Sequence, residues 1–439
     1  YHYLHTMQFI RQILFELRHQ SLVTWLSIIG TALAIFLVMS NFMIGRIDSV
    51  QVAPETNRPR ICYGFGMDII QPNNHTTSNP SLETAQFIYD NLEGVECVSY
   101  SQADYTTFTT VADNGKRLPA RVKSVDQNYW KIYDYTFEEG HPFTPEEVEA
   151  GVKNIIITRD YANNIFGKGE PAIGRHVNIN NKDFIVSGIV KTPNPLLART
   201  SADVFPTHTA MQLPQNIMCN YFGNYCPVLL LKPGVTISDM RPRINHRYDE
   251  LTRKLAKTDS ICEAIPHGQP YSTEMMARGV STNTGITADD NNYITYLIYA
   301  ILLLIPAINL SSMTRARMRR RVSEIGLLRA FGCTRGRLIL NLLTENFILS
   351  MLGGLLGLLL SFIFIMGFSN YFVVYGDIYY VTPEQSVATP SFEMLFSWQA
   401  FLLVLAFCFI LNLISSGLPI LKAASINPAE ALNGDNNHK

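Results

Sequence analysis

The residues best suited to bind another molecule are arginines gathered in one segment, residues 315–337. The segment carries Arg315, Arg317, Arg319, Arg320, Arg321, Arg329, Arg335 and Arg337. Its one acidic residue is Glu324, and residues 338–421 contain no lysine or arginine. Positive charge concentrated beside long apolar segments marks the side of a membrane that faces the cytoplasm. The arginine segment is therefore predicted to lie inside the cell, where it can bind lipid headgroups or a protein.

The same segment is predicted to form an amphipathic helix over residues 317–331. Its apolar side chains recur at helical spacing, at Val322, Ile325, Leu328 and Phe331. Arg320 stands four residues before Glu324, a pair worth roughly a few tenths of a kcal/mol, and Gly332 ends the helix. Lipid headgroups alone would account for the arginines, at about 1 kcal/mol each. Lipid headgroups do not explain Glu324, Gly326 or the apolar stripe, so we favour a helix that docks on a cytoplasmic partner.

No catalytic motif accompanies this segment. The sequence holds no GxxxxGK(S/T) phosphate loop and no HExxH, CxxC or GxSxG pattern. We therefore predict that the chain is not an enzyme, holds no cofactor or metal, and depends on another chain for ATP hydrolysis. Five histidines are interpreted as ordinary surface residues rather than metal ligands: His141, His176, His208, His246 and His267. The net charge of -1 gives no reason to expect nucleic-acid binding.

Four apolar blocks are each long enough to cross a membrane as a helix. They cover residues 21–45, 291–313, 342–368 and 397–418. At about 1.5 Å per residue, roughly 20 residues cross the hydrocarbon layer of about 30 Å. The sequence thus predicts a membrane protein with four transmembrane α-helices, both termini in the cytoplasm, and a large α/β (α+β) extracytoplasmic domain between helices 1 and 2.

The segments between the spans complete this organisation. Residues 1–20 form either an amphipathic helix in the membrane surface or an extension of the first span. The others are a cytoplasmic coupling segment at 314–341, an acidic and aromatic extracytoplasmic loop at 369–396, and a cytoplasmic tail at 419–439. Within the third span, Gly353 and Gly357 form a GxxxG pair, which lets another helix approach closely.

The extracytoplasmic domain, residues 46–290, has the composition of a folded aqueous domain. Helices are predicted over residues 81–92 and 237–255, and strands at 95–100, 154–158 and 184–190. Its five cysteines are Cys62, Cys97, Cys219, Cys226 and Cys262. An odd number allows at most two disulfides, with Cys219 and Cys226 the nearest pair. Free buried thiols are the equal alternative.

Several stretches resemble one family of membrane proteins. Residues 324–332 (EIGLLRAFG) are followed by Glu345, Gly353, Gly354 and Gly357, and the C-terminal part contains Pro419, Ala423, Ala424, Pro428, Ala431 and Leu432. These patterns, with residues 27–30 (SIIG), resemble the FtsX-type permease of MacB-like ABC transporters, including its coupling helix. A further set of residues resembles the MacB-type periplasmic core: Gly140, Phe143, Ala162, Phe166, Gly167, Pro171, Ile173, Gly174, Val177 and Ile179.

The resemblance implies a permease that works as a homodimer or heterodimer on a dimer of cytoplasmic ABC ATPases, which bind the ATP and Mg. It assigns ATPase coupling to Arg321, Glu324, Ile325, Gly326, Leu328, Arg329, Ala330 and Gly332. Closure of the ATPases would move the outer domain by mechanotransmission, for export or extraction of a substrate from the periplasm or outer leaflet. Membrane lipid and a periplasmic adaptor or outer-membrane component are further implied partners, and the bacterial inner membrane is the implied location.

Two departures from the family pattern point to a specialised outer domain. Residues 271–289 are too rich in Gly, Thr and Ser for a stalk helix, and residues 193–267 show little match. The alternative function is an FtsX-like regulator or scaffold that controls a periplasmic partner without transport.

Overall fold

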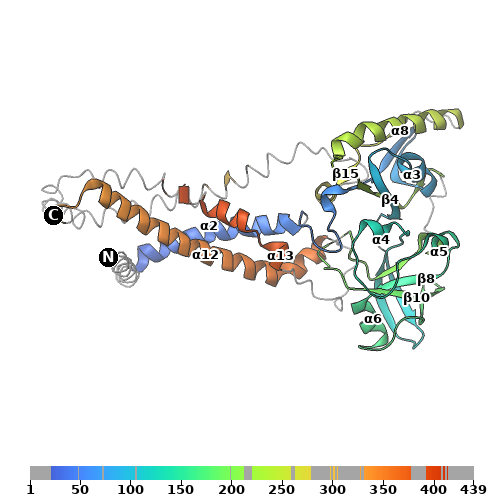
Figure 1. Ribbon diagram of the computed structural model, residues 1–439, viewed down its shortest axis with the longest axis horizontal. Coiled ribbons are helices and arrows are strands. Elements are labelled where there is room, and N and C mark those ends of the chain that lie inside the picture. Colours follow the sequence, from blue (N-terminus) through green and yellow to red (C-terminus); the bar gives the residue numbers. More distant parts are fainter. Residues whose placement is uncertain are drawn as a thin grey trace. The chain divides into compact units, whose positions relative to one another are not determined.

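The computed structural model describes residues 21–47, 49–71, 74–103, 106–197, 199–211, 220–258, 263–277, 331–376 and 392–406, with some single positions beyond them. The chain forms two compact units (Figure 1). The first, here the membrane unit, comprises Tyr1–Gly45, Asp290–Phe368 and Ser391–Lys439. The second, the outer unit, comprises Arg46–Asp289 and Ser369–Pro390.

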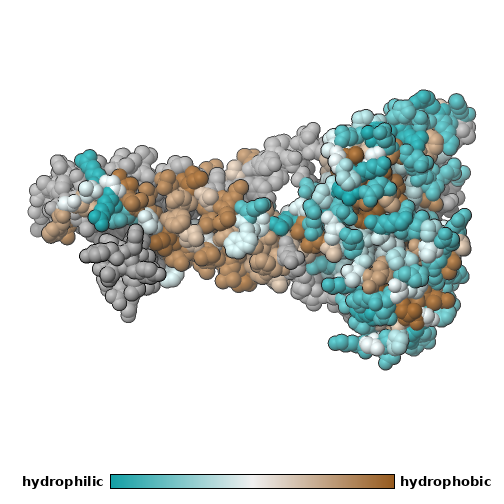
Figure 2. Space-filling view, in the orientation of Figure 1, coloured by the Kyte–Doolittle hydropathy of each residue, from teal (hydrophilic) through white to brown (hydrophobic). Residues whose placement is uncertain are grey.

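The described part of the membrane unit is helical. Its helices are α2 (Ser21–Ile47), α12 (Arg335–Gly376) and α13 (Phe392–Leu395), and residues 398–406 are also helical. Within the described residues, two helices are long and apolar enough to cross a membrane, at Ile28–Ile47 and Phe347–Phe368. Figure 2 shows hydrophobic side chains over these helices and mostly hydrophilic ones over the outer unit. The predicted span at 291–313, and much of that at 397–418, lie outside the described residues, so the count of four stays a prediction.

The helix that contains the third predicted span extends beyond that span at both ends. The helix begins at Arg335 instead of residue 342, and it runs to Gly376, inside the predicted loop at 369–396. Hydropathy marks where a chain enters hydrocarbon, but a helix continues until its backbone is interrupted, and this stretch contains no proline. Its 42 residues give a rod of about 63 Å, roughly twice the thickness of the hydrocarbon layer.

The described outer unit contains three β-sheets. The first has the order β15-β1-β13-β4, with β15 at Tyr271–Ser272, β1 at Ile61–Tyr63, β13 at Tyr225–Leu231 and β4 at Val95–Gln102. The second has the order β7-β10-β8-β11-β6-β5-β9: Phe137–Gly140, Lys182–Val190, Asn154–Thr158, Val204–Pro206, Arg117–Val122, Thr106–Ala112 and His176–Ile179. The third has the order β12-β3-β2-β14: Phe222–Gly223, Asn74–Pro80, Met67–Gln71 and Glu263–Ile265.

Helices connect and cover these sheets. They are η1 (Arg58–Arg60), α3 (Leu82–Tyr89), α4 (Tyr129–Ile132), α5 (Pro145–Glu149), α6 (Arg159–Phe166), α7 (His208–Met211), α8 (Ile237–Thr258) and α9 (Thr273–Ala277). The predicted helices at 81–92 and 237–255 are confirmed as α3 and α8, and the predicted strands as β4, β8 and β10. Ser81 is the N-cap of α3, a position that serine favours. Its Oγ accepts a hydrogen bond from the N–H of Thr84 at 3.3 Å.

The second sheet closes on itself. Strand β9 pairs with β5 and also with β10, so the six strands from β10 to β9 form a small barrel, with β7 added beside β10. Buried side chains of alternate positions, such as Ile155 and Ile157 of β8 with Phe184 of β10, fill its core together with α6. The neighbouring residue Ile156 points to a different core. The strand is therefore apolar throughout because both of its faces are covered.

The first sheet is also buried on both faces. Leu229 and Leu231 of β13 pack with α3 and α8, whereas Val228 and Leu230 pack into an aromatic core around Tyr129. That aromatic core also includes side chains of the barrel, among them Phe205 of β11. It consequently joins the first sheet to the barrel within the outer unit.

Candidate functional site

The predicted ATPase-coupling segment is described only at its C-terminal end. Arg321, Glu324, Ile325, Gly326, Leu328, Arg329 and Ala330 lie outside the described residues. Gly332 has a φ of 88°, a left-handed conformation that glycine adopts without steric strain. The N–H of Phe331 donates to the carbonyl of Leu327 at 3.1 Å, so Gly332 directly follows a helical turn. This arrangement is that of a helix C-terminal cap.

Helix α12 begins three residues after Gly332 and carries the last two arginines of the segment. The N–H of Leu338 donates to the carbonyl of Thr334 at 3.1 Å. Arg335 and Arg337 are exposed, and the ring of Phe331 is 83% exposed.

The GxxxG pair of α12 lies against α2 (Figure 1). A Cβ atom added to Gly353 would lie 2.7 Å from the Cβ of Thr31, and one added to Gly357 would lie 2.5 Å from the carbonyl oxygen of Ala32. Ser361, one turn further, donates from Oγ to the carbonyl of Phe36 at 3.1 Å. The two helices therefore pack with their backbones in close approach, as small residues permit inside a membrane.

A buried ion pair stands at the beginning of the outer unit, just after α2. The Nε of Arg58 lies 2.6 Å from Oε2 of Glu55, and their side chains are 6% and 1% exposed. Arg58 also donates from Nη1 to the carbonyl of Ile47, the last residue of α2, at 2.7 Å. The other carboxylate oxygen of Glu55 accepts a hydrogen bond from Oγ1 of Thr200 at 2.8 Å. Sequence reasoning missed this pair, because a Glu and an Arg three residues apart resemble an ordinary surface pair.

A second buried acid, Asp68 of β2, is held between two histidines. Its Oδ2 lies 2.7 Å from Nε2 of His75, and its Oδ1 lies 2.8 Å from Nε2 of His267. Burial acts to raise the pKa of Asp68, but the neighbouring His267, Thr77 and His75 outweigh it and lower that pKa below its ordinary value.

The interpretation of five histidines as surface residues was wrong for two of them. His267 lies against Asp68, and His208 is buried beside Tyr225, with 5.8 Å between ring centroids. Burial lowers the pKa of His208, and the nearby Asp126 opposes that shift. His141, His176 and His246 are exposed as expected. Residue type alone gave no signal, because the covering side chains come from distant parts of the chain.

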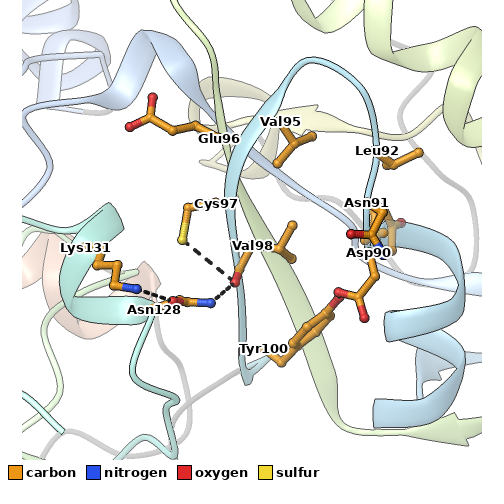
Figure 3. Close-up of a pocket in the computed structure, with 11 residues that line it drawn as sticks. Asp90, Asn91, Leu92, Val95, Glu96, Cys97, Val98, Tyr100, Asn128 and Lys131 are labelled. Carbon is orange, nitrogen blue, oxygen red and sulfur yellow. Dashed lines mark hydrogen bonds between the residues drawn. The ribbon is translucent and has the colours of Figure 1, made fainter. Parts of the chain in front are cut away.

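The outer unit has an open pocket of about 370 Å³ beside strand β4 (Figure 3). Its lining includes the end of α3, the first half of β4, and Asn128 and Lys131. Asn128 donates from Nδ2 to the carbonyl of Val98 at 2.8 Å and accepts from Nζ of Lys131 at 3.0 Å. The hydroxyl of Tyr100 donates to Asp90. These polar groups of the pocket wall therefore bond to one another.

Metal and disulfide chemistry find little support in the residues that the structure describes. Among them, no group of three or more His, Cys, Asp or Glu side chains is arranged to hold a metal ion. Cys62 and Cys97 are free thiols, whereas a bond between Cys219 and Cys226 stays a prediction because only one of the two residues is described. Burial raises the pKa of Cys97, which makes its thiol less reactive. Cys219 and Cys262 lie outside the described residues.

Two family models match the chain, in succession along the sequence. A model described as the MacB-like periplasmic core domain matches residues 24–247. A model described as the FtsX-like permease C-terminal matches residues 296–428. Together they cover the first span, most of the outer unit and the arginine segment.

Similar proteins include one named as a permease and others named as combined ATP-binding/permease proteins. An uncharacterized ABC transporter permease, YknZ of Bacillus subtilis, is 24% identical over 359 residues, which are 81% of each chain. The macrolide export ATP-binding/permease protein MacB 1/2 of Paracoccus denitrificans is 22% identical over 96% of this chain and 58% of its own length. The chain thus spans less than two thirds of this MacB relative. A crystal structure of the periplasmic region of MacB from Actinobacillus actinomycetemcomitans aligns with 51% of this chain and 96% of its own, at 15% identity and a TM-score of 0.34.

Proposed function

Because the chain belongs to the family that combines a MacB-like periplasmic core domain with an FtsX-like permease domain, we propose that it is the membrane subunit of an ABC transporter driven by a separate ATPase. The observation that carries the proposal is the arginine segment, which lies within the permease match and between two apolar spans. The 439 residues contain no phosphate loop of their own. ATP and Mg are therefore assigned to a cytoplasmic partner.

The proposed topology has four spans, both termini in the cytoplasm and the outer unit in the periplasm of a bacterial inner membrane. Two of these spans correspond to α2 and α12. The contrast between the arginine segment and residues 338–421, which carry no lysine or arginine, supports this orientation. A second permease subunit, identical or related, completes the assembly.

The proposed mechanism is mechanotransmission. The coupling helix receives the closure of the ATPases, and α12 leaves the same segment as one helix of 42 residues. Since α2 packs on α12 through Gly353 and Gly357, a displacement of one helix is passed to the other. Helix α2 then continues directly into the outer unit, whose movement would export or extract a substrate.

Reversal of charge in the coupling helix tests the proposal. Glu324→Lys and Arg329→Glu should each lower the amount of ATPase that co-purifies with the chain about tenfold, the effect of losing roughly 1.4 kcal/mol of interface energy. The matched control is Arg253→Glu, at an exposed position of α8 in the outer unit. Unchanged recovery of the ATPase with both coupling variants would remove the coupling assignment. Recovery of a periplasmic hydrolase and no ATPase would favour the regulator instead.

A further inference from the structure

The pair of Glu55 and Arg58 places two opposite charges in a buried position of the outer unit. Both side chains are almost fully withdrawn from water, at 1% and 6% exposure. Taking two charges out of water costs several kcal/mol per ion, and their mutual attraction repays this only with good geometry and further hydrogen bonds. Well-packed apolar side chains would stabilise such a site equally well. The position of the pair therefore calls for an explanation beyond stability.

The arginine binds the end of the first membrane helix. The last carbonyl groups of a helix have no partners within the helix, and they carry its negative partial charge. In α2, the N–H groups of Ser49 and Val50 both bond to the carbonyl of Arg46 at 2.9 Å. The carbonyl of Ile47 accepts instead from Nη1 of Arg58 at 2.7 Å. The guanidinium of Arg58 thus satisfies the terminal carbonyl of α2, at a residue that belongs, like Arg58, to the outer unit.

Glu55 connects Arg58 to residues at the centre of the outer unit. Its Oε1 accepts from Oγ1 of Thr200, whose carbonyl in turn accepts from the hydroxyl of Tyr135 at 2.5 Å. The ring of Tyr135 packs against Phe205, with 5.5 Å between ring centroids. These rings belong to the aromatic core that joins the first sheet to the barrel. The chain of contacts therefore runs from the end of α2 to the joint between the two main sheets.

A second set of bonds fixes the same segment. The N–H of Asp134 donates to the carbonyl of Pro54 at 2.8 Å, and the hydroxyl of Thr56 donates to the carboxylate of Asp134. Residues on both sides of Glu55 are thus held to the chain that follows α4. The segment after α2 is therefore hydrogen-bonded to the core at several points and is not a free linker.

We infer that Arg58 and Glu55 are positioning residues that hold the end of α2 and pass its displacement to the aromatic core of the outer unit. The inference rests on the proposed function, because only an ATP-driven permease would displace α2. It goes beyond that function by assigning the transfer of motion to one ion pair. Without the pair, the same helix movement would be absorbed by the chain between Ile47 and the first sheet.

The test uses the full chain with its co-purifying ATPase in lipid nanodiscs. The double variant Arg58→Met with Glu55→Leu removes both charges at similar volume, so that neither is left buried alone. Hydrogen–deuterium exchange is compared in residues 199–206, without nucleotide and with ATP and vanadate. Wild type should show an ATP-dependent change there, and the double variant should lose most of it. Arg58→Lys, which retains the charge, should restore part of the change.

A resting-state measurement checks that the pair acts at the expected place. In the absence of nucleotide, residues 46–60 of the double variant should exchange about tenfold faster, as expected from the loss of a charge-assisted hydrogen bond. The matched control replaces the Arg175–Asp113 ion pair of the barrel with Met and Leu, and it should retain the ATP-dependent change. A double variant that responds to ATP like wild type overturns the inference and leaves the proposed function intact. A wild type that never responds overturns both.

Discussion

Alanine at Gly357 is expected to loosen the packing of α2 on α12, whereas alanine at Gly367 of the same helix is not. The Cβ added at Gly357 would lie 2.5 Å from the carbonyl oxygen of Ala32 and 3.1 Å from the backbone nitrogen of Phe36. Both are backbone atoms, so no side-chain rotation can relieve the contact. At Gly367, no atom lies within 4 Å of the added Cβ. The two positions therefore separate the effect of contact from the effect of helix propensity.

The expected magnitude follows from two opposing contributions. Alanine in place of glycine within a helix gains about 1 kcal/mol of stability where nothing obstructs it. Overpacking a close contact costs about 1–3 kcal/mol, because one helix must move away from the other. Gly367→Ala should therefore raise the free energy of unfolding slightly, and Gly357→Ala should lower it. Because both variants gain the same helix propensity, they should differ by the cost of overpacking alone, roughly 1–3 kcal/mol.

Unfolding of the purified full chain in mixed micelles, titrated with sodium dodecyl sulfate, measures this difference. Gly353→Ala serves as a second test, since its Cβ would lie 3.0 Å from the carbonyl oxygen of Ile28. Equal free energies for Gly357→Ala and Gly367→Ala would show that α2 and α12 do not approach each other at this point. Transfer of motion between the two helices would then need another route.

Two further predictions concern the outer unit and the topology. The folded Asp68 carboxyl has a pKa below its ordinary value of 3.8, so its contribution to stability is complete above that pH and is lost as the pH falls through the lower pKa of the folded state. In urea titrations between about pH 5 and about pH 2, the free energy of unfolding of Asp68→Asn should fall less with falling pH than that of wild type. An equal fall in both proteins would contradict the ion-pair account. Cys333 should react with a membrane-impermeant maleimide only in inverted vesicles, and Ala150→Cys only in right-side-out vesicles, whereas the opposite pattern would reverse the topology.

Local pattern was sufficient to predict those elements whose boundaries are set by nearby residues. Ser81 begins α3 with a side-chain cap, and the apolar run at 154–158 forms β8. Closure of the barrel could not be predicted, because β9 reaches both β5 and β10 through pairings between residues far apart in sequence. The length of α12 was underestimated for a different reason: residues 335–341 and 369–376 are less apolar than the span but are equally able to be helical.

The candidate sites divide in the same way. Gly353 and Gly357 were recognisable because a GxxxG pair carries its meaning within one helix, whatever helix comes to pack on it. Arg58 and His267 were not, since each becomes significant only through a partner brought near by folding: the carbonyl of Ile47 in one case and the carboxylate of Asp68 in the other. A single sequence shows the types of these side chains but not the loss of water around them.

The two units also use polar groups differently, and this difference bears on how a displacement passes from one end of the chain to the other. In the membrane unit, α2 and α12 approach through glycines, and the hydroxyl of Ser361 bonds across the contact without placing a charge in hydrocarbon. At the end of α2 a full charge is held instead: Arg58 is buried, and its ion pair with Glu55 compensates for the loss of water. Arg58 can therefore form a stronger hydrogen bond to the helix carbonyl than a neutral donor would. This bond lies at the end of α2, which is where a pull along the helix axis would be delivered to the outer unit.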